Sequence, residues 1–217
     1  ELLRRIGTDA MRAVGCQGAG TVECVMDSTT GDAFCLGLNP RLDLGHAVSE
    51  AVMAVDVVAE QVRIAAGQPL TWSATPMAMR GHAIECRIHA EDPRDAYRPS
   101  SGRVTRLEAP AGPGVRIDAG IGLGGEVGVH DDTLIAVVTA WGSDREHARR
   151  RLRRALHECV IEGVETTLPL LRGLLDHPEF IAGGTCRDIC ADPASLLPES
   201  RGPIGSDRAQ ASGAPAP

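Results

Sequence analysis

The chain has 217 residues, an apolar content of 43%, only 2% aromatic residues and a net charge of −7. The scarcity of aromatic rings argues against a stacking surface for single-stranded nucleic acid, and the negative charge disfavours any polyanionic partner. All 22 basic residues are arginines, so a site that places lysines on phosphate groups is not expected. The length is sufficient to bury a core in one domain or in two small ones.

The first seventy residues alternate between helical and extended patterns. Apolar spacing and turn residues predict, in chain order, a helix at Glu1–Val14, a strand at Gly18–Val25, a turn at Ser28–Asp32, a strand from Phe34 and a long helix at Val48–Ala66. Ser49 is placed to cap the last of these helices, which Gly67 and Pro69 would end. The segment therefore reads as helix, hairpin and helix.

The remainder of the chain changes from strands to helices. Short strands are predicted at His82–Ala90, Arg103–Glu108, Val115–Ile121 and Thr133–Trp141. Ser143 and Glu146 have the spacing of a capping box, which predicts a helix through about Glu162, and a second helix is expected at Thr166–Leu175. This order is typical of an α+β protein with a boundary near Gln68–Arg80. From Pro198 the Pro, Gly, Ser and Ala content predicts a disordered tail over 198–217.

A polar hinge joins the strand at Phe34 to the following helix. It contains Asn39, Arg41 and Asp43, and an arginine offers a planar pair of donors to carboxylate or phosphate oxygens. Gly37 and Gly45 flank these residues without a side chain, so proton transfer or metal ligation must come from elsewhere or be absent. The hinge is therefore predicted to bind an anion, but without a side chain at Gly37 or Gly45 for metal ligation or proton transfer.

Two other features of the sequence favour ordinary structural interpretations. His46 is expected to be a hydrogen-bonded residue at the helix entry rather than a base. The arginines between Arg149 and Arg154 are expected to form the solvated face of a helix whose apolar face holds Leu152 and Leu156. A nucleic-acid interface is not expected there, because the net charge of the chain is negative.

Cysteine usage and hydropathy indicate a cytoplasmic chain. The seven cysteines include no pair with C-x-x-C spacing, and Cys186 and Cys190 lack a second ligand pair, so free thiols in a reducing cytosol are expected. No apolar run approaches eighteen residues, which predicts neither a membrane span nor a membrane partner. The first residue is Glu rather than Met, which suggests a fragment of a longer reading frame.

Several motifs in fixed order resemble one enzyme family. They are Gly18-Ala-Gly-Thr-Val-Glu23, Asn39-Pro-Arg41 with His46 and Glu50, Gln61-Val-Arg-Ile-Ala-Ala-Gly-Gln-Pro69, and Arg80-Gly-His-Ala-Ile-Glu-Cys-Arg-Ile-His-Ala-Glu-Asp-Pro93. Similar motifs follow at Pro99-Ser-Ser-Gly-Arg-Val, Gly114-Val-Arg116, Asp132 and Gly183-Gly-Thr185. Each is weak alone, but in this order and spacing they are similar to biotin carboxylase over roughly residues 1–190.

The resemblance implies a partial molecule of α+β class. It implies the end of an ATP-grasp domain at residues 1–70, followed at 76–192 by a β-rich biotin carboxylase C-terminal domain with flanking helices. Such enzymes use ATP with Mg or Mn and bicarbonate to carboxylate biotin. The implied partners are a biotin carboxyl carrier protein and a carboxyltransferase, as in acyl-CoA carboxylases of fatty acid metabolism. A homodimer is also implied, with Arg116 at its interface.

The family's metal and bicarbonate site can be carried over to the hinge. Glu23 and Asn39 occupy two metal-ligand positions, whereas Gly37 stands at the second acidic one. Arg41 matches the catalytic arginine that holds bicarbonate and stabilises the biotin oxyanion, and Asp43 replaces a glutamine at the bicarbonate position. The bicarbonate set implied by the resemblance is Arg41, Asp43 and Leu44.

The resemblance also implies losses and a biotin contact. Gly45 replaces the glutamate expected to deprotonate bicarbonate. Arg87 matches the arginine that contacts the biotin ureido oxygen, and it could instead be an ion-pair partner of Glu85 or Glu91. Val137 stands where the family usually has lysine. Two hypotheses remain open: a biotin carboxylase part that is inactive alone, or a non-catalytic binding and dimerisation module.

Overall fold

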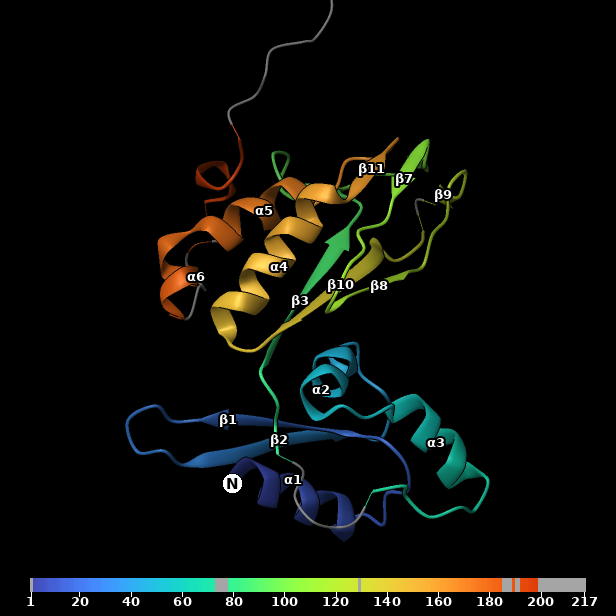
Figure 1. Ribbon diagram of the computed structural model, residues 1–217, viewed down its shortest axis with the longest axis vertical. Coiled ribbons are helices and arrows are strands. Elements are labelled where there is room, and N and C mark those ends of the chain that lie inside the picture. Colours follow the sequence, from blue (N-terminus) through green and yellow to red (C-terminus); the bar gives the residue numbers. More distant parts are fainter. Residues whose placement is uncertain (1, 73–77, 129, 185–188, 190–191, 199–217) are drawn as a thin grey trace, which may run out of the picture.

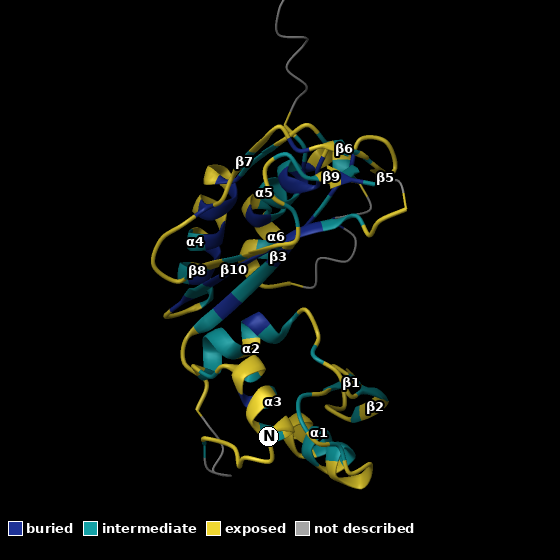
Figure 2. Ribbon diagram, turned by 90° about the vertical axis from the view of Figure 1, so that its right-hand side faces the viewer, coloured by how far each residue is buried: buried dark blue, intermediate teal, exposed yellow. Residues whose placement is uncertain are grey.

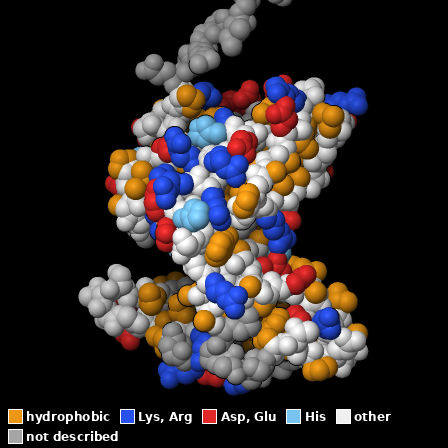
Figure 3. Space-filling model, in the orientation of Figure 1, with side chains coloured by type: hydrophobic (Ala, Val, Ile, Leu, Met, Phe, Trp, Pro, Cys, Tyr) orange, Lys and Arg blue, Asp and Glu red, His pale blue; other side chains and the backbone are white. Residues whose placement is uncertain are grey.

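The computed structural model describes residues 2–72, 78–128, 130–184, 189 and 192–198. These residues form two lobes joined by a single extended connection, and the molecule narrows between them (Figures 1 and 3). The mixture of helices and antiparallel strands confirms the predicted α+β class. No described helix is both long enough and apolar enough to cross a membrane. Residues 199–217 of the predicted tail, residues 73–77 of the predicted boundary, and Thr185, Cys186 and Cys190 lie outside the described residues.

The N-terminal lobe contains a β-hairpin and three helices. Its elements are α1 (Leu2–Ala13), β1 (Thr21–Met26), β2 (Ala33–Asn39), α2 (His46–Met53) and α3 (Val57–Ala65). β1 and β2 pair antiparallel, and the turn between them is closed because the Asp27 carboxylate accepts the backbone N–H groups of Thr29 and Thr30. The predicted hairpin is therefore confirmed, although β1 begins three residues later than expected.

The long helix predicted at Val48–Ala66 is wrong, because the chain breaks it into α2 and α3. Ala54 adopts a left-handed conformation with φ of 53°, which ends α2. Asp56 then caps α3 by accepting the backbone N–H of Ala59 at 2.7 Å. Ser49 does not cap a helix either: α2 begins at His46, and its N-cap Gly45 offers no side-chain acceptor.

The C-terminal lobe is built on a three-stranded antiparallel sheet in the order β3 (His82–His89), β10 (Leu134–Gly142) and β8 (Val115–Ala119). Its helices are α4 (Arg145–Glu158), α5 (Leu168–Asp176), α6 (Pro178–Ala182) and the 3₁₀ turn η2 (Pro193–Ser195). Three short strand pairs extend it: β4 (Glu91–Asp92) with β5 (Arg98–Pro99), β6 (Gly102–Arg103) with β9 (Glu126–Val127), and β7 (Arg106–Glu108) with β11 (Val160–Glu162).

Three local predictions in this lobe need correction. The strand predicted at Arg103–Glu108 is divided between β6 and β7, which pair with different strands. The N-cap of α4 is Asp144 rather than Ser143, and its carboxylate accepts the backbone N–H of His147 at 2.8 Å. The same helix ends at Glu158, because the chain then becomes extended and pairs with β7.

The arginine run of α4 is only partly a solvated face. Arg149 is 8% exposed, and it donates to the Glu146 carboxylate and to the backbone oxygen of Leu175. Arg151 reaches across to the backbone oxygen of Trp141. Arg149 thus links α4 to α5, and Arg151 links α4 to the sheet. The prediction that the arginines of this helix form a solvated face is therefore wrong for these two residues.

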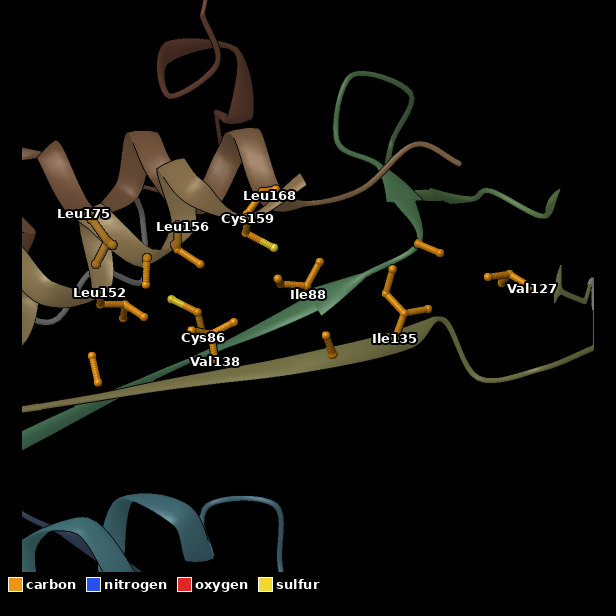
Figure 4. Close-up of a cluster of buried hydrophobic side chains, with 14 residues drawn as sticks. Cys86, Ile88, Val127, Ile135, Val138, Leu152, Leu156, Cys159, Leu168 and Leu175 are labelled. Carbon is orange, nitrogen blue, oxygen red and sulfur yellow. The ribbon is translucent and has the colours of Figure 1, made fainter. Parts of the chain in front are cut away.

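The core lies between the sheet and the helices α4 and α5. Figure 4 shows Ile88 and Val138 of the sheet facing Leu152 and Leu156 of α4, all four of them fully buried. The N-terminal lobe is different: within residues 2–72, only Ala47 and Glu60 are buried (Figure 2). Hydrophobic stabilisation is therefore concentrated in the C-terminal lobe.

Polar contacts hold the two lobes together at α2. The backbone N–H of Arg80 donates to the Val52 oxygen at 2.7 Å, and the Trp141 indole N–H donates to the Arg80 oxygen at 2.8 Å. Gly81 follows with φ of 66°, and a Cβ there would collide with the Gly142 oxygen, so this close passage requires glycine. These contacts place α2 against the sheet on the side opposite to α4 (Figures 1 and 4).

Candidate functional site

A cavity of about 450 Å³ lies in the N-terminal lobe where the hinge after β2 meets the segment before β1. Its wall includes Arg41, Asp43 and Gly45 from the hinge, together with Gly20 before β1. The hinge is held in place by backbone bonds from Arg41 to the Asn39 oxygen and from His46 to the Asp43 oxygen. The structure therefore gathers most of the predicted hinge residues around one opening.

Arg41 is the free cation of this cavity. Its side chain is exposed, and among the described residues it makes no hydrogen bond or ion pair, so all five guanidinium N–H groups can meet an anion. Asp43 lines the same cavity and brings a negative charge to it. Leu44 is 43% exposed and does not line the cavity.

His46 acts structurally at the start of α2. Its ring Nδ1 lies 2.9 Å from the Asp43 oxygen, which also accepts the backbone N–H of His46. The ring is therefore tied to the backbone of the hinge, and the prediction of a hydrogen-bonded helix-entry residue is confirmed. The imidazole lines the cavity but has its Nδ1 already engaged.

Glu23 and Asn39 lie side by side across the hairpin. The Asn39 amide donates to Glu23 Oε1 at 2.9 Å, although the two residues are sixteen positions apart. In the strand register Glu23 stands directly opposite Gly37. A carboxylate at position 37 would thus project beside that of Glu23, because opposite residues of an antiparallel pair lie on the same face.

Neither hinge glycine is required by the backbone. A Cβ at Gly37 would meet no atom within 4 Å, and this residue does not have a positive φ. Gly45 has φ of −67°, and a Cβ there would lie 3.9 Å from Asp43 Oδ2, which is ordinary contact. Both positions could therefore carry a larger side chain, so the backbone does not require glycine at either of them.

The donors that remain do not by themselves form a metal site. Glu23 supplies one carboxylate, Asn39 uses its amide N–H on that carboxylate, and Gly37 supplies nothing. Among the described residues no group of three or more His, Cys, Asp or Glu side chains could hold a metal ion. Mg²⁺ and Ca²⁺ prefer several oxygen ligands, so this pair is an incomplete set.

The other two predicted residues lie on the C-terminal sheet and not at this cavity. Arg87 on β3 is 45% exposed, and its Nε lies 3.2 Å from Glu85 Oε1. Arg116 on β8 forms ion pairs with Glu50 at 2.6 Å and with Asp118 at 2.7 Å. The hydrogen bond to Asp118 raises the pKa of Arg116 most, and the hydrogen bond to Glu50 raises it further.

Some cavity residues were not predicted from the sequence. Met11 from α1, Thr21 from β1 and Ser49 from α2 all line the cavity. A Cβ at Gly20 would collide with the Met11 side chain, which shows how closely α1 approaches this segment. The glycines of the Gly18-Ala-Gly motif could have indicated a close approach of another segment to the backbone. The sequence did not indicate that this segment is α1.

Comparison with protein families divides the chain into two matches. Residues 85–190 match the family described as Biotin carboxylase C-terminal domain. Residues 1–73 match the family described as Carbamoyl-phosphate synthase L chain, ATP binding domain. The cavity and the hinge lie in the second match, and Arg87 and Arg116 lie in the first.

Proteins similar to this chain include several biotin carboxylases. The chain is 39% identical over 186 residues to a biotin carboxylase of Nostoc sp., which covers 84% of this chain and 41% of that protein. It is 43% identical over 175 residues to a biotin carboxylase of Allochromatium vinosum, which covers 81% of this chain and 38% of that protein. The chain thus spans about two fifths of the length of these relatives.

Solved structures share the fold. The biotin carboxylase subunit of pyruvate carboxylase has a TM-score of 0.84 at 36% identity, covering 90% of this chain and 44% of that chain. The biotin carboxylase domain dimer of Hydrogenobacter thermophilus 2-oxoglutarate carboxylase, solved with MgADP, ADP and bicarbonate, has a TM-score of 0.82 at 35% identity, covering 88% of this chain and 42% of that chain.

Proposed function

The chain belongs to the biotin carboxylase family, and from this premise we propose that it is part of a biotin carboxylase that does not turn over by itself. The complete reaction would use ATP, with Mg or Mn, and bicarbonate to carboxylate biotin. In this part, residues 1–70 would contribute the end of the ATP-grasp domain, and residues 76–192 would contribute the C-terminal domain. The partners would be a biotin carboxyl carrier protein and a carboxyltransferase.

The unpartnered guanidinium of Arg41 carries the proposal. It lines a cavity of about 450 Å³ and has no carboxylate partner among the described residues, so it can hold a small anion such as bicarbonate through two parallel hydrogen bonds. A delocalised cation at this place would also stabilise negative charge that develops on a biotin oxygen. Arg87, on the other lobe, would contact the ureido oxygen of biotin.

The absence of a base at position 45 supports the lack of independent turnover. A general base contributes about 10²–10⁴-fold to a rate, and Gly45 provides none. Asp43 also places a carboxylate in the anion cavity, where it opposes the binding of bicarbonate. Leu44 would contribute only backbone contacts to the anion, because its exposed side chain does not line the cavity.

A second candidate is a non-catalytic module that keeps the fold and binds a carboxylase or a second copy of itself. The glycines at positions 37 and 45 favour it, because an enzyme without both a metal carboxylate and a general base should lose several orders of magnitude in rate. Arg116 would take part in such self-association. Its guanidinium is already paired with Glu50 and Asp118 within the chain, so an added contact must share or displace these pairs.

The direct test is bicarbonate-dependent ATP cleavage with free biotin. The chain is assayed alone and mixed with an N-terminal fragment from a biotin carboxylase of known activity. We expect no turnover alone and none above background in the mixture. The double variant Gly37→Glu/Gly45→Glu is assayed in the same mixture, with Arg41→Ala added to it as the control.

The outcomes separate the two candidates. Turnover by the double variant that disappears with Arg41→Ala supports a carboxylase part with two lost side chains. Turnover by the unmodified chain in the mixture would overturn the non-catalytic module and would show that the two glycines do not prevent catalysis, whereas turnover by the chain alone would contradict the proposed lack of independent activity. If the double variant binds the fragment but stays inactive, the non-catalytic module is favoured, and sedimentation at several concentrations then tests self-association.

A further inference from the structure

Two cysteines face each other across the hairpin of the N-terminal lobe. In the antiparallel register of β1 and β2, which lie side by side in Figure 1, Cys24 stands directly opposite Cys35. Residues paired in this way have Cα atoms about 4.5–5.5 Å apart and side chains on one face of the sheet. A disulfide needs a Cα separation of about 4.4–6.8 Å. The backbone therefore already holds the two residues at a distance that a disulfide can bridge.

Both thiols can meet a small reagent from solution. Cys35 is exposed, Cys24 is partly exposed, and both are free. Cys35 Sγ lies 3.9 Å from the Gly37 oxygen of its own strand. Because this side chain is exposed, rotation about χ1 can move the sulfur among its staggered positions. Bond formation thus requires a side-chain rotation and no change of the strand register.

The other described cysteines do not share this arrangement. Cys86 of β3 is buried and lies opposite Val138, and Cys159 is buried at the end of α4. Cys16 lies between α1 and β1, and its backbone N–H donates to the Met11 oxygen. Among the cysteines that the structure describes, the cross-strand pair is therefore the one that the strand register prepares for a disulfide.

A cross-link at this place would act on a weakly specified strand register. Neither β1 nor β2 has a buried residue, so burial does not fix their register as it does in a packed sheet. The register also shifts between Glu23 and Cys24, which leaves Leu36 without a paired residue and disrupts the ladder locally. A covalent bond between Cys24 and Cys35 would fix the register directly beside Glu23 and Gly37.

We propose that Cys24 and Cys35 form a reversible disulfide by exchange with a low-molecular-weight disulfide such as oxidised glutathione. The Cys35 thiolate attacks one sulfur of oxidised glutathione, whose S–S bond breaks and releases one glutathione thiolate. The Cys24 thiolate then attacks the Cys35 sulfur of this mixed disulfide and releases the second glutathione. The protons of the two cysteines pass through water to the two released thiolates. The protein loses two electrons and oxidised glutathione gains them. This modification does not depend on the proposed function.

The test exposes the full chain to oxidised glutathione, blocks the remaining thiols with N-ethylmaleimide and digests the product with a protease that cleaves after Asp and Glu. Cleavage at the acidic residues between them places three cysteines on different peptides: Cys16, Cys24 and Cys35. We expect mass spectrometry to find the Cys24 peptide joined to the Cys35 peptide, and reduced glutathione to separate them. Glutathione on each cysteine without a linked peptide would overturn the proposal.

Single substitutions identify the partner of Cys35. Cys24→Ser should leave Cys35 as a lasting mixed disulfide with glutathione, because the thiol that would release the glutathione is gone. Cys16→Ser is the matched control and should leave the link between Cys24 and Cys35 unchanged. Joining of the Cys35 peptide to the Cys16 peptide in the unmodified chain would refute the pairing.

A second measurement asks whether the fold itself presents the pair. The concentration of oxidised glutathione that half-forms the link between Cys24 and Cys35 is measured at a fixed concentration of reduced glutathione, for the folded chain and for the chain in urea. The folded chain should need at least about tenfold less, because the strands hold the two thiols together. Equal concentrations in the two states would contradict a site prepared by the strand register.

Discussion

At the scale of single residues, the hinge combines an unpaired arginine with a strand position that carries no side chain. Arg41 retains a free guanidinium in the cavity, whereas Glu23 has Asn39 as its neighbour and faces the bare backbone of Gly37. The backbone at position 37 is ordinary β-strand with open space around it. A carboxylate could therefore be introduced there without rebuilding the fold.

Gly37→Glu should create a divalent-cation site with Glu23. Two carboxylates on one face attract a divalent ion more strongly than one does, and we expect Mn²⁺ to bind at least about tenfold tighter than to the unmodified chain. Mn²⁺ electron paramagnetic resonance titration measures the change. Glu23→Gln in the Gly37→Glu background is the control, and unchanged Mn²⁺ affinity in that double variant would contradict a shared site.

The thiols should differ in reactivity according to their burial. Cys35 is exposed on the hairpin, whereas Cys86 and Cys159 are buried. Burial, aided by the Glu85 carboxylate, raises the pKa of Cys86 to about 12, and burial also raises the pKa of Cys159. Because the thiolate is the reactive form, iodoacetamide at pH 8 should label Cys35 first and leave the other two unlabelled until the chain unfolds. Peptide mass spectrometry measures this order.

At the scale of elements, α4 combines a capped start with a deeply buried face. Asp144 caps its first turn, and Leu152, Ala155 and Leu156 are fully buried against the sheet and α5. Arg149 closes the contact by donating to the Leu175 oxygen at the end of α5. This helix therefore contributes strongly to the stability of the C-terminal lobe.

Leu152→Ala should cost about 3 kcal/mol of unfolding free energy, because it removes buried methyl groups and leaves a cavity. Urea unfolding followed by circular dichroism measures the loss. Leu123→Ala is the matched control, since that leucine is 70% exposed, and its effect should stay within about 0.5 kcal/mol. Similar losses in the two variants would contradict the assigned core.

The start of α4 should make stability depend on acid pH. The backbone N–H of His147 lowers the pKa of Asp144, and the Arg149 guanidinium lowers the pKa of Glu146. Groups whose pKa is depressed in the folded state stabilise it above their unfolded pKa and lose that contribution as the pH falls. The urea midpoint should thus decrease below about pH 4.5, the ordinary value for glutamate. Asp144→Asn keeps an acceptor but does not titrate, so its decrease should be smaller.

At the scale of the whole molecule, the lobes differ in how they are stabilised. The C-terminal lobe has a continuous core, whereas the hairpin of the N-terminal lobe leaves Val25 51%, Phe34 61% and Leu36 66% exposed. Contacts through α2, including the ion pair between Glu50 and Arg116, connect the N-terminal lobe to the C-terminal lobe. The stability of the N-terminal lobe therefore depends on its contacts with other surfaces, because its own described residues bury little apolar area.

Hydrogen exchange should reveal this difference directly. Amides of β3 and β10 should exchange only through global unfolding, while those of α1, β1 and β2 should exchange much faster through local opening. Exchange mass spectrometry of the full chain measures both. An N-terminal biotin carboxylase fragment that docks on the exposed hairpin should slow the second set alone. Equal protection of both lobes from exchange in the isolated chain would contradict the prediction that the N-terminal lobe is the less stable one.

The sequence by itself indicated the family and the α+β class, both of which are confirmed. These conclusions depend on the order and spacing of motifs and on local periodicity, which are properties of the linear chain. The absence of carboxylates at Gly37 and Gly45 can be read from the sequence in the same way. The predicted roles of Arg41, Arg87 and Arg116 depend on the family likeness and stay predictions.

Only the tertiary structure decided which residues meet. Helical periodicity continued through 48–66, but the left-handed Ala54 and the Asp56 cap divide that segment. Arg149 looked solvated in the sequence because its acceptor, the Leu175 oxygen, lies 26 residues away. The sequence likewise did not indicate that Thr139 of β10 lines a cavity together with Ala47 and Ala51 of α2. Burial and hydrogen bonding between distant residues depend on packing, which local sequence patterns do not encode.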